Sequence, residues 1–336
     1  MQALHGGGVG PRKSTRGEPR HGSLPSPFLP PKFTRSLGKR PNIVNVKSRP
    51  HSDLLGFLRT ACTHASHMGR ELPLVPFYVK EHPVGWLRPS FAEELGRWPH
   101  VFDVSSSWVT LRTKPDTVAA RTKAMKEVTE SLRKEGQIQG WRGELVSIAH
   151  HYASPELLRI ERAATRHFGM MAYAAHLNGF VRKGGTVHTW VARRAADKSI
   201  DPGMLDNLVG GRVAAGMTVD ETIHKEAWEE AGIAPKLLED LYCVGAVRVE
   251  YTVPEGLHRE ILFVHDLWLP ADFKPRNQDG EVGEIKLMKT EDVVEKILDG
   301  AFTLDAGAVM IDALIRQGVP LPEDEQYLDL IRLLKP

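Results

Sequence analysis

The most constraining feature of this 336-residue sequence is a group of three glutamates within one short, strongly helical segment. Glu226, Glu229 and Glu230 stand at positions i, i+3 and i+4, so a helix over Asp220–Ala231 places their carboxylates on one face. Like charges at this spacing repel each other by roughly 0.2–0.5 kcal/mol per pair on a helix surface. The pattern therefore favours a bound counter-charge at this face of the helix.

Glycines flank the helix on both sides. Gly232 follows its last turn and can adopt the left-handed conformation that ends helices, while Gly210, Gly211 and Gly216 let the backbone approach a phosphate closely. Magnesium accepts carboxylate oxygens, keeps several waters and bridges to substrate phosphates. An ordinary solvated acidic face is the alternative for clustered glutamates, but the glycines at both ends favour a site for Mg²⁺ or Mn²⁺.

The stretch 211–233, GRVAAGMTVDETIHKEAWEEAGI, resembles the Nudix box, G-x5-E-x7-R-E-U-x-E-E-x-G-U, in which U is a bulky aliphatic residue. Six of the nine specified positions match outright, namely Gly211, Glu226, Glu229, Glu230, Gly232 and Ile233. Three depart from the pattern: Met217 replaces the first glutamate, Lys225 the arginine and Ala227 the aliphatic residue. In the family the first box glutamate usually pairs with the box arginine, so this scaffold pair is missing here in its usual form.

The resemblance implies Mg²⁺ or Mn²⁺ held by Glu226, Glu229 and Glu230, with a further carboxylate from a loop between later strands. The acidic turn over residues 277–284 suits that role, with Glu281 as the first choice and Glu284 as the second. The implied catalytic residues are Glu229 and Glu230, and Glu229 is preferred as the general base for a metal-activated water. The expected substrate-binding residues are Gly211, Lys225 and Arg194.

Longer segments resemble one branch of the Nudix family: VPFYVKEHPVGWLRPSFAEELGRWPHVF (75–102), HLNGFV (176–181), TWVARRAADKSIDPGMLDNLVGG (189–211) and FTLDAGAVMIDALIRQG (302–318). In that branch an N-terminal domain precedes a Nudix domain related to the one fused to fungal thiamine pyrophosphokinase. The resemblance implies hydrolysis of thiamine diphosphate analogues, such as oxo- or oxythiamine diphosphate, to the monophosphate and phosphate. This reaction would be a metabolite repair.

Three other functions remain open at this point. The first is hydrolysis of a nucleoside diphosphate derivative. The second is an isopentenyl-diphosphate isomerase-like activity, which needs a paired cysteine and glutamate. Cys243 is the only candidate for it, and its apolar strand predicts a buried, inert thiol. The third is a ligand sensor without catalysis, against which the three clustered carboxylates argue.

The chain divides into three parts. Residues 1–50 form a basic tail rich in proline and glycine, which we expect to be disordered, with a transit peptide as the alternative. Residues 51–165 predict a small α/β domain. Residues 166–336 predict the Nudix fold, a mixed β-sheet between helices, so the fold class is α/β (α+β).

The Nudix resemblance implies a small diphosphate as the partner, and charge and composition bear on two other kinds of partner, nucleic acids and membranes. Residues 1–42 contain eight basic residues and one acidic residue, so their net charge is +7 and the rest of the +2 chain carries −5. The basic balance therefore does not indicate nucleic-acid binding. No apolar run predicts a membrane span. We expect an intracellular, cytoplasmic protein, with a mitochondrial or plastid location as the alternative. The sequence leaves open whether the protein forms a homodimer.

Local patterns predict individual elements. In residues 51–165 they first predict a helix with Leu54, Leu58 and Cys62 on one face, and two strands in Phe77–Arg88. A helix then begins with a capping box of Ser90 and Glu93. The remaining predicted elements are a strand over Val101–Leu111, a helix over Pro115–Glu135 and a helix capped by Ser154. In residues 166–336 they predict a hairpin of Met170–Val181 and Thr186–Ala195, strands Val244–Val253 and Glu260–Leu269, and helices near 290–299, 305–317 and 323–334.

Overall fold

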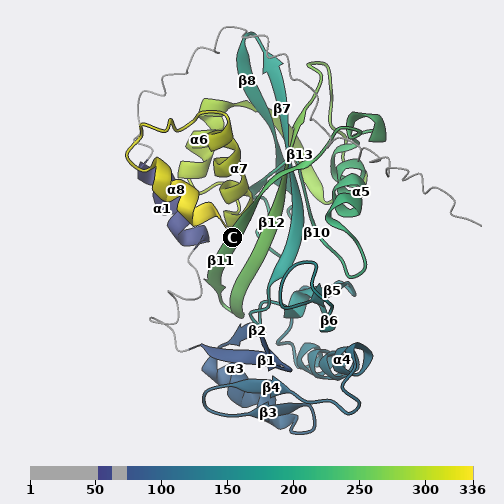
Figure 1. Ribbon diagram of the computed structural model, residues 1–336. Helices are drawn as coiled ribbons and strands as arrows, with labels where there is room; N and C mark the ends of the chain where they lie inside the picture. Colours follow the sequence, from purple (N-terminus) through teal and green to yellow (C-terminus); the bar gives the residue numbers. More distant parts are fainter. Residues whose placement is uncertain (1–51, 63–73, 336) are drawn as a thin grey trace, which may run out of the picture. The chain divides into compact units, whose positions relative to one another are not determined.

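The computed structural model describes residues 52–62 and 74–335 of the chain. These residues belong to one compact unit, 44–336, in which a small domain precedes the long strand β7 (Ala172–Lys183) and a larger domain follows it (Figure 1). The tail predicted over 1–50 lies outside the described residues and stays a prediction. The predicted fold class is confirmed, because a small α/β domain precedes a mixed sheet flanked by helices.

The N-terminal domain contains a four-stranded sheet in the order β2-β1-β4-β3 and a separate two-stranded sheet, β5-β6. Its elements are β1 (Val75–Val79), β2 (His82–Leu87), α3 (Pro89–Glu94), β3 (Phe102–Val104), β4 (Val109–Leu111), α4 (Val118–Lys134), β5 (Leu145–Ile148) and β6 (Leu158–Glu161). One apolar core joins both sheets to α4, with Phe77 and Phe168 among its largest fully buried side chains. Their ring centroids lie 5.5 Å apart.

The predicted capping box of Ser90 and Glu93 is wrong. Helix α3 begins at Pro89, with Arg88 as its N-cap and without a side-chain capping hydrogen bond. Proline is favoured at the first helical position because its φ is already helical and its missing N–H has no helical partner there. The helix therefore begins two residues earlier than predicted, and Ser90 lies inside it.

Two further boundaries differ from the prediction. Helix α4 begins at Val118 because Thr117 is its N-cap, with a side chain that accepts from the N–H of Ala120; Pro115 lies outside the helix. The strand predicted over 101–111 is two antiparallel strands, β3 and β4, separated by a turn. In that turn the Ser105 hydroxyl oxygen accepts from the N–H of Trp108 at 3.0 Å, a local bond that interrupts the extended chain.

The helix predicted after Ser154 is wrong, because this segment forms strand β6. Val146 of β5 faces Ile160, and Ile148 faces Leu158, in an antiparallel pair. Leu158 and Ile160 are buried, as the apolar pattern predicted, but a short apolar run does not distinguish a strand from a buried helix. Pairing with the preceding strand, β5, decides the conformation.

The C-terminal domain is built on a seven-stranded mixed sheet with β7 at its centre. Strand β12 pairs with β7 in parallel, whereas β10 and β8 pair with it antiparallel. Residues 174–177 of β7 pair with β10, and residues 179–183 pair with β8, so two strands share one edge of β7. The remaining strands of this sheet are β8 (Thr186–Arg194), β9 (Leu205–Asp206), β10 (Val209–Arg212), β11 (Cys243–Val253), β12 (Gly256–Trp268) and β13 (Val282–Lys289). The predicted hairpin, now β7 and β8, is confirmed.

Helices cover both faces of this sheet (Figure 1). Helix α5 (Val219–Ala231) packs through Ile223 and Ala227 into an apolar cluster on one face. The other face carries α6 (Thr290–Leu298), α7 (Leu304–Arg316) and α8 (Tyr327–Leu334). The predicted helices of this domain are therefore present, with α8 shorter at its start than predicted.

Helix α1 (Ser52–Ala61) packs in the C-terminal domain although it precedes the N-terminal sheet in the chain. Leu54 and Leu58 have no exposed surface and lie in one cluster with residues of α6, α7 and α8. Cys62 continues this contact through an isolated parallel bridge to Glu250 of β11. The predicted apolar face of the helix is confirmed, and chain order did not reveal which domain it packs in.

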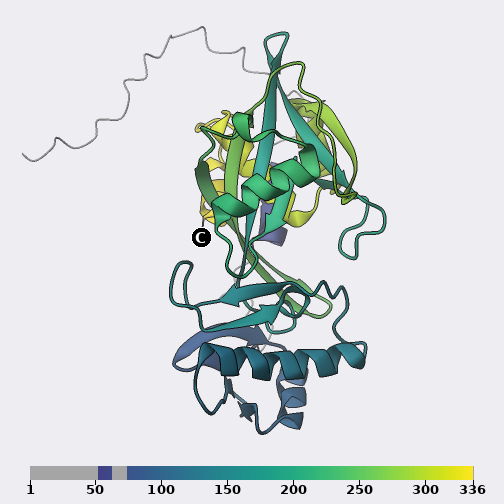
Figure 2. The ribbon, with the colours of Figure 1, turned by 90° about the vertical axis from the view of Figure 1, so that its right-hand side faces the viewer.

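Backbone and side-chain hydrogen bonds join the two domains, which Figure 2 shows from the side. The N–H of Ala215, in the loop after β10, donates to the carbonyl of Leu145 in β5 at 2.8 Å. Arg88 donates from Nη1 to the carbonyl of Pro254 at 2.8 Å, in the turn between β11 and β12. The N-terminal domain therefore packs directly against the end of the large sheet.

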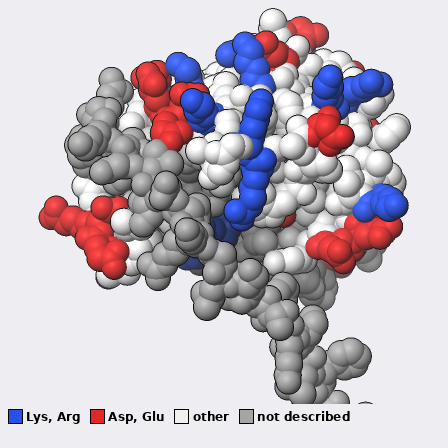
Figure 3. Space-filling view, turned by 90° about the horizontal axis from the view of Figure 1, so that it is seen from above, with Lys and Arg blue, Asp and Glu red and all other residues white. Residues whose placement is uncertain are grey.

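The described surface has mixed charge. In the view from above, basic and acidic side chains are interspersed among neutral ones (Figure 3). Among the helices of residues 52–62 and 74–335, none combines the length and the apolar character that a bilayer span requires.

Glu250 provides a test of buried charge in this fold. Its side chain has no exposed surface and accepts from Arg259 Nε at 2.6 Å and from Arg248 Nη2 at 2.8 Å. Burial raises the pKa of Glu250, but the charges and hydrogen bonds of the two arginines outweigh burial and leave it below the ordinary 4.5. Because the folded pKa is lowered, this stabilisation is present above the unfolded pKa and is lost as the pH falls through the folded pKa.

We therefore expect Glu250→Ala to lower the free energy of unfolding by about 3 kcal/mol at neutral pH, since two arginines lose a buried partner. The difference from the wild type should shrink as the pH falls below the ordinary glutamate pKa. Urea unfolding of both proteins, at neutral pH and at a pH below the ordinary glutamate pKa, measures this difference. Glu295→Ala, an exposed change on α6, is the matched control. A difference that stays constant in acid would contradict the expected linkage.

Candidate functional site

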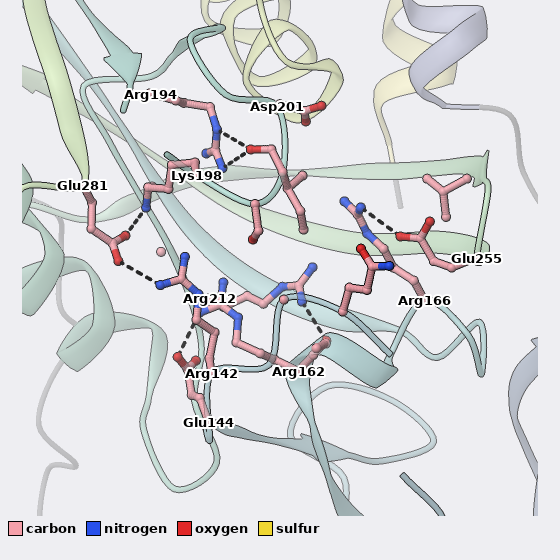
Figure 4. A pocket seen from close by; sticks show the side chains of 18 of the residues that line it. Arg142, Glu144, Arg162, Arg166, Arg194, Lys198, Asp201, Arg212, Glu255 and Glu281 are labelled. Atoms are coloured by element: carbon pink, nitrogen blue, oxygen red, sulfur yellow. Dashed lines mark hydrogen bonds and ion pairs between the residues drawn. The ribbon is translucent and has the colours of Figure 1, made fainter. Parts of the chain in front are cut away.

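A pocket of about 910 Å³ lies where the two domains meet. The C-terminal domain lines it with α5, β10, the loop between β8 and β9, and the turn between β11 and β12. The N-terminal part of the chain adds residues from 137–144 and 162–167. In Figure 4, Glu281 and Glu255 lie on different sides of the view, and the guanidinium groups of Arg142, Arg162 and Arg212 lie between them.

Helix α5 begins and ends by strong local signals. Thr218 is the N-cap, and its hydroxyl oxygen accepts from the N–H of Glu221 while the Glu221 carboxylate accepts from the N–H of Thr218. Gly232 ends the helix in the left-handed region with φ 62°. These caps fix the rotation of the helix, and with it the face that presents its glutamates.

The last turn of α5 packs closely on β10. The carboxylate of Glu230 accepts from the N–H of Gly210 at 2.8 Å, and the residue is only 8% exposed. Burial raises the pKa of Glu230 well above the ordinary 4.5, although the Gly210 hydrogen bond opposes this. At Gly211, a Cβ would lie 2.4 Å from Cγ of Glu226, so only glycine leaves room for that side chain.

Glu226 and Glu229 share one cation within the chain. Lys225 donates to Glu226 at 3.0 Å and to Glu229 at 2.6 Å. Burial raises the pKa of Glu226, and the nearby Lys225 only partly offsets it. Partial burial lowers the pKa of Lys225, but its bonds to both glutamates outweigh burial and leave it raised. The three glutamates line one pocket with carboxylate oxygens, the donor type that Mg²⁺ and Mn²⁺ prefer.

The two candidates for a further carboxylate lie in different places. Glu281 lines the pocket, where it pairs with Lys198 and lies 3.7 Å from Arg142 (Figure 4). Burial raises the pKa of Glu281, but Lys198 and Arg142 outweigh it and leave the pKa lowered. Glu284 does not line the pocket, and pairs instead with Lys286 at 2.8 Å.

Arg194 lines the pocket with its donors already engaged. Nη1 donates to Asp206 at 2.9 Å, and Nε and Nη2 donate to the carbonyl of Ile200 at 3.2 and 2.9 Å. Its guanidinium holds the loop between β8 and β9 against β9. A contact from Arg194 to a substrate would require it to give up one of these bonds.

The loop before α5 is held by the N-terminal domain. The N–H of Ala215 donates to the carbonyl of Leu145 in β5 at 2.8 Å, and the N–H of Val213 donates to the carbonyl of Tyr173 in β7 at 2.8 Å. The box positions Met217 and Lys225 lack the usual ion pair, and Lys225 bonds to Glu226 and Glu229 instead. Backbone hydrogen bonds therefore fix the loop without that pair.

Five arginine and lysine residues of the pocket were not predicted from the sequence: Arg142, Arg162, Arg166, Lys198 and Arg212. They are scattered between residues 142 and 212 and form no motif. Three of them precede β7 and reach the pocket only because the N-terminal domain packs on the end of the large sheet. No sequence signal in a single chain would have found them.

A buried network supports the floor of the pocket. Nε2 of His258 lies 3.4 Å from Glu260 and 3.2 Å from Asp305, and Nδ1 accepts from Arg166 at 3.1 Å. The imidazole nitrogen and the carboxylate oxygens of these three residues are atoms that could ligate a metal ion. However, Arg212 donates to Glu260 at 2.9 Å, so Arg212 and Arg166 already balance the two negative charges. The network orients both arginines.

Cys243 is exposed, which corrects the prediction of a buried thiol. It is the first residue of β11, a strand at the edge of the sheet, so only its neighbours further along the strand reach the core. Its Sγ donates to the carbonyl of Gly245 at 3.1 Å, and the residue does not line the pocket. The structure therefore does not bring it together with the pocket glutamates.

Two family models match separate parts of the chain. The model described as "NUDIX domain" matches residues 176–306. The model described as "Domain of unknown function (DUF4743)" matches residues 57–172. The α5 glutamates lie in the first match, and Arg142, Arg162 and Arg166 lie in the second.

Curated relatives match across both domains. The chain is 36% identical to "Nudix hydrolase 24, chloroplastic" of Arabidopsis thaliana, over 84% of this chain and 79% of that protein. It is 35% identical to "Nudix hydrolase 20, chloroplastic" of the same organism, with the same coverage. It is 30% identical to "Uncharacterized protein YJR142W" of Saccharomyces cerevisiae, over 68% of this chain and 72% of that protein.

Gly211→Ala tests the contact between β10 and α5. The added Cβ displaces the flexible Glu226 side chain rather than the backbone, so the fold should persist. An off-rotamer glutamate costs about 1 kcal/mol, so we expect Mn²⁺ affinity to fall about fivefold in calorimetry.

Gly245→Ala is the control for the Gly211 variant, because its Cβ would meet nothing within 4 Å. It should bind Mn²⁺ like the wild type. Equal Mn²⁺ affinity in the wild type and both variants would show that Glu226 does not take part in metal binding.

Proposed function

Because the chain belongs to the Nudix hydrolase family and is a pyrophosphohydrolase of that family, we propose that it hydrolyses the diphosphate of thiamine diphosphate analogues. Oxo- and oxythiamine diphosphate are the proposed substrates, and the monophosphate and phosphate are the products. The observation that carries the reaction is the set of three α5 carboxylates lining one pocket together with basic side chains. The resemblance of residues 75–102, 189–211 and 302–318 to the thiamine-linked branch supports the substrate.

The metal would be held by Glu226, Glu229 and Glu230, with Glu281 as the fourth carboxylate. When bound, Mg²⁺ or Mn²⁺ neutralises the diphosphate and lowers the pKa of a coordinated water. The donor set fits, because Glu230 is buried and Glu226 is half-buried, so that their charged forms need a nearby cation. Lys225 now lies between Glu226 and Glu229, and we propose that its ammonium group turns from them to the substrate phosphate.

Glu229 is the proposed general base. Its side chain is 36% exposed, compared with 17% for Glu226, so it has the better access to a water. Glu230 stays fixed by the N–H of Gly210, which suits a ligand that must not move. Gly211 would let the phosphates of the substrate approach β10, and Arg194 would contact the substrate from the end of β8.

The organic part of the substrate meets few apolar residues. Among the described residues that line the pocket, Ala163, Ile200, Val253 and Pro254 are apolar, and none is Phe, Tyr or Trp. A purine base usually binds by stacking on an aromatic side chain. This lining favours a small heterocycle over a nucleoside, so nucleoside diphosphate derivatives are the second candidate. The isomerase-like alternative loses support because Cys243 lies outside the pocket.

Glu230→Gln tests the reaction. Glutamine keeps an acceptor for the Gly210 N–H but removes a metal ligand, so the fold should persist. Loss of groups that merely orient metal ligands costs 10- to 100-fold, so we expect phosphate release to fall by at least about 100-fold. Removal of Mg²⁺ with a chelator should abolish the wild-type activity. Glu239→Gln, an exposed change outside the pocket, is the control. Full activity of Glu230→Gln would refute the assignment.

A substrate panel tests the proposed specificity. We expect kcat/KM to be at least about tenfold higher for oxo- or oxythiamine diphosphate than for nucleoside diphosphates or ADP-ribose, a difference of about 1.4 kcal/mol in transition-state binding. Phosphate release and mass analysis of the products measure it. The reverse order would replace the thiamine analogues with the second candidate and leave the hydrolase assignment in place.

A further inference from the structure

Two arginines of the N-terminal domain carry donors that the described chain leaves largely unused. The side chain of Arg142 lies 3.7 Å from Glu281 and makes no hydrogen bond within residues 52–62 and 74–335. Arg162 donates from Nη1 to Glu144 at 2.8 Å, and its Nε and Nη2 bond to no described residue. Both guanidinium groups line the pocket (Figure 4).

Arg166 adds a third, more firmly held guanidinium. Its Nε donates to His258 at 3.1 Å, and its Nη1 lies 3.4 Å from Glu255. Its side chain is only 13% exposed, and Nη2 has no acceptor among the described residues. Since the buried His258 lies beside the buried Glu260 and the partly exposed Asp305, Arg166 is oriented before any ligand binds.

The arginines of the C-terminal domain differ in this respect. Arg212 donates from Nε and Nη2 to Glu260, and from Nη1 to the carbonyl of Arg162. All three guanidinium nitrogens of Arg194 donate hydrogen bonds to Asp206 or Ile200. The guanidinium donors that remain available in the pocket therefore come from the part of the chain that precedes β7.

The spacing between these donors and the glutamate face is set by the fold. The bond of 3.2 Å from Arg212 Nη1 to the carbonyl of Arg162 ties the segment before β7 to β10. Arg212 directly follows Gly211, against which Glu226 lies. The N-terminal arginines and the α5 carboxylates thus keep a fixed relation across one pocket.

We propose that Arg142, Arg162 and Arg166 bind the terminal phosphate of an uncapped diphosphate while the α5 carboxylates engage the metal-bound part. This inference rests on the proposed hydrolase function and assigns a substrate-binding role to the N-terminal domain. The substrate class is R–O–diphosphate with a free end, in preference to a diphosphate capped by two organic groups, as in ADP-ribose.

The chemistry of the two classes explains this preference. A terminal phosphate carries more negative charge near neutral pH than a phosphate esterified on both sides, and it has three oxygens free to accept. A guanidinium group binds two such oxygens in parallel through its fork of N–H donors. A capped diphosphate lacks this end, so the same arginines would have fewer acceptors to bind.

The test is the variant Arg162→Gln, because its only described side-chain partner, Glu144, is not a proposed metal ligand. Inorganic pyrophosphate and ADP-ribose serve as probes, each titrated calorimetrically into the Mg²⁺-loaded protein. Loss of a charge-assisted hydrogen bond is worth about 1.5 kcal/mol or more, so pyrophosphate affinity should fall about tenfold. ADP-ribose affinity should change less than about twofold. For the terminal diphosphate substrate, KM should rise and kcat should change little.

Arg159→Gln is the matched control, since Arg159 lies in the same segment, pairs with Glu156 and does not line this pocket. Arg162→Lys should recover part of the affinity because it keeps the charge and loses the fork. Thermal unfolding checks that each variant is folded.

Three outcomes count against the proposals, and they are distinguishable. Unchanged pyrophosphate affinity in a folded Arg162→Gln protein, with normal wild-type turnover, would overturn the role of the arginine. An equal loss for pyrophosphate and ADP-ribose would overturn the preference for a free end. A wild type that binds pyrophosphate but releases no phosphate from any diphosphate would overturn the hydrolase proposal instead.

Discussion

The close packing of α5 on β10 is the contact on which the site depends. Glu230 accepts from the N–H of Gly210, and Glu226 occupies the space that a side chain at Gly211 would need. Both contacts draw carboxylates toward a strand that is itself paired to the central β7. Their burial raises the pKa of each carboxyl group, so the geometry that positions the glutamates also creates the need for a cation. We regard this linked constraint as the origin of the proposed metal chemistry.

The N-terminal domain completes the pocket that α5 and β10 line on one side. Its strand β5 holds the loop before α5 through the bond from Ala215 to Leu145, where the family pattern has an ion pair. Its last segment carries Arg162 to the pocket, and Arg212 of β10 fastens that segment in place. The same interface that stabilises the loop therefore brings cations to the carboxylates. A domain with no catalytic motif of its own can in this way contribute to substrate binding.

Local signals predicted structure well where the stabilising contacts are themselves local. Helix α5 formed as expected because its cap at Thr218 and its stop at Gly232 are within the segment. The β7–β8 hairpin formed because its turn and its two strands are adjacent in sequence. Prediction failed at β6, whose apolar run became a strand only by pairing with β5, and at Cys243, whose exposure follows from the edge position of β11. In both cases the deciding feature, strand pairing or position in the sheet, lies outside the segment whose pattern was read.

The sequence by itself determined the glutamate face, because helix periodicity alone places Glu226, Glu229 and Glu230 together. It also determined the fold class, since the order of strand and helix patterns left few alternatives. Only the tertiary structure decided that Glu281 lines the pocket and Glu284 does not, and that the N-terminal arginines reach it. The physical reason is that periodicity orients side chains within one element. A pocket, in contrast, is formed by the packing of several elements, and their distance along the chain does not show which of them come together.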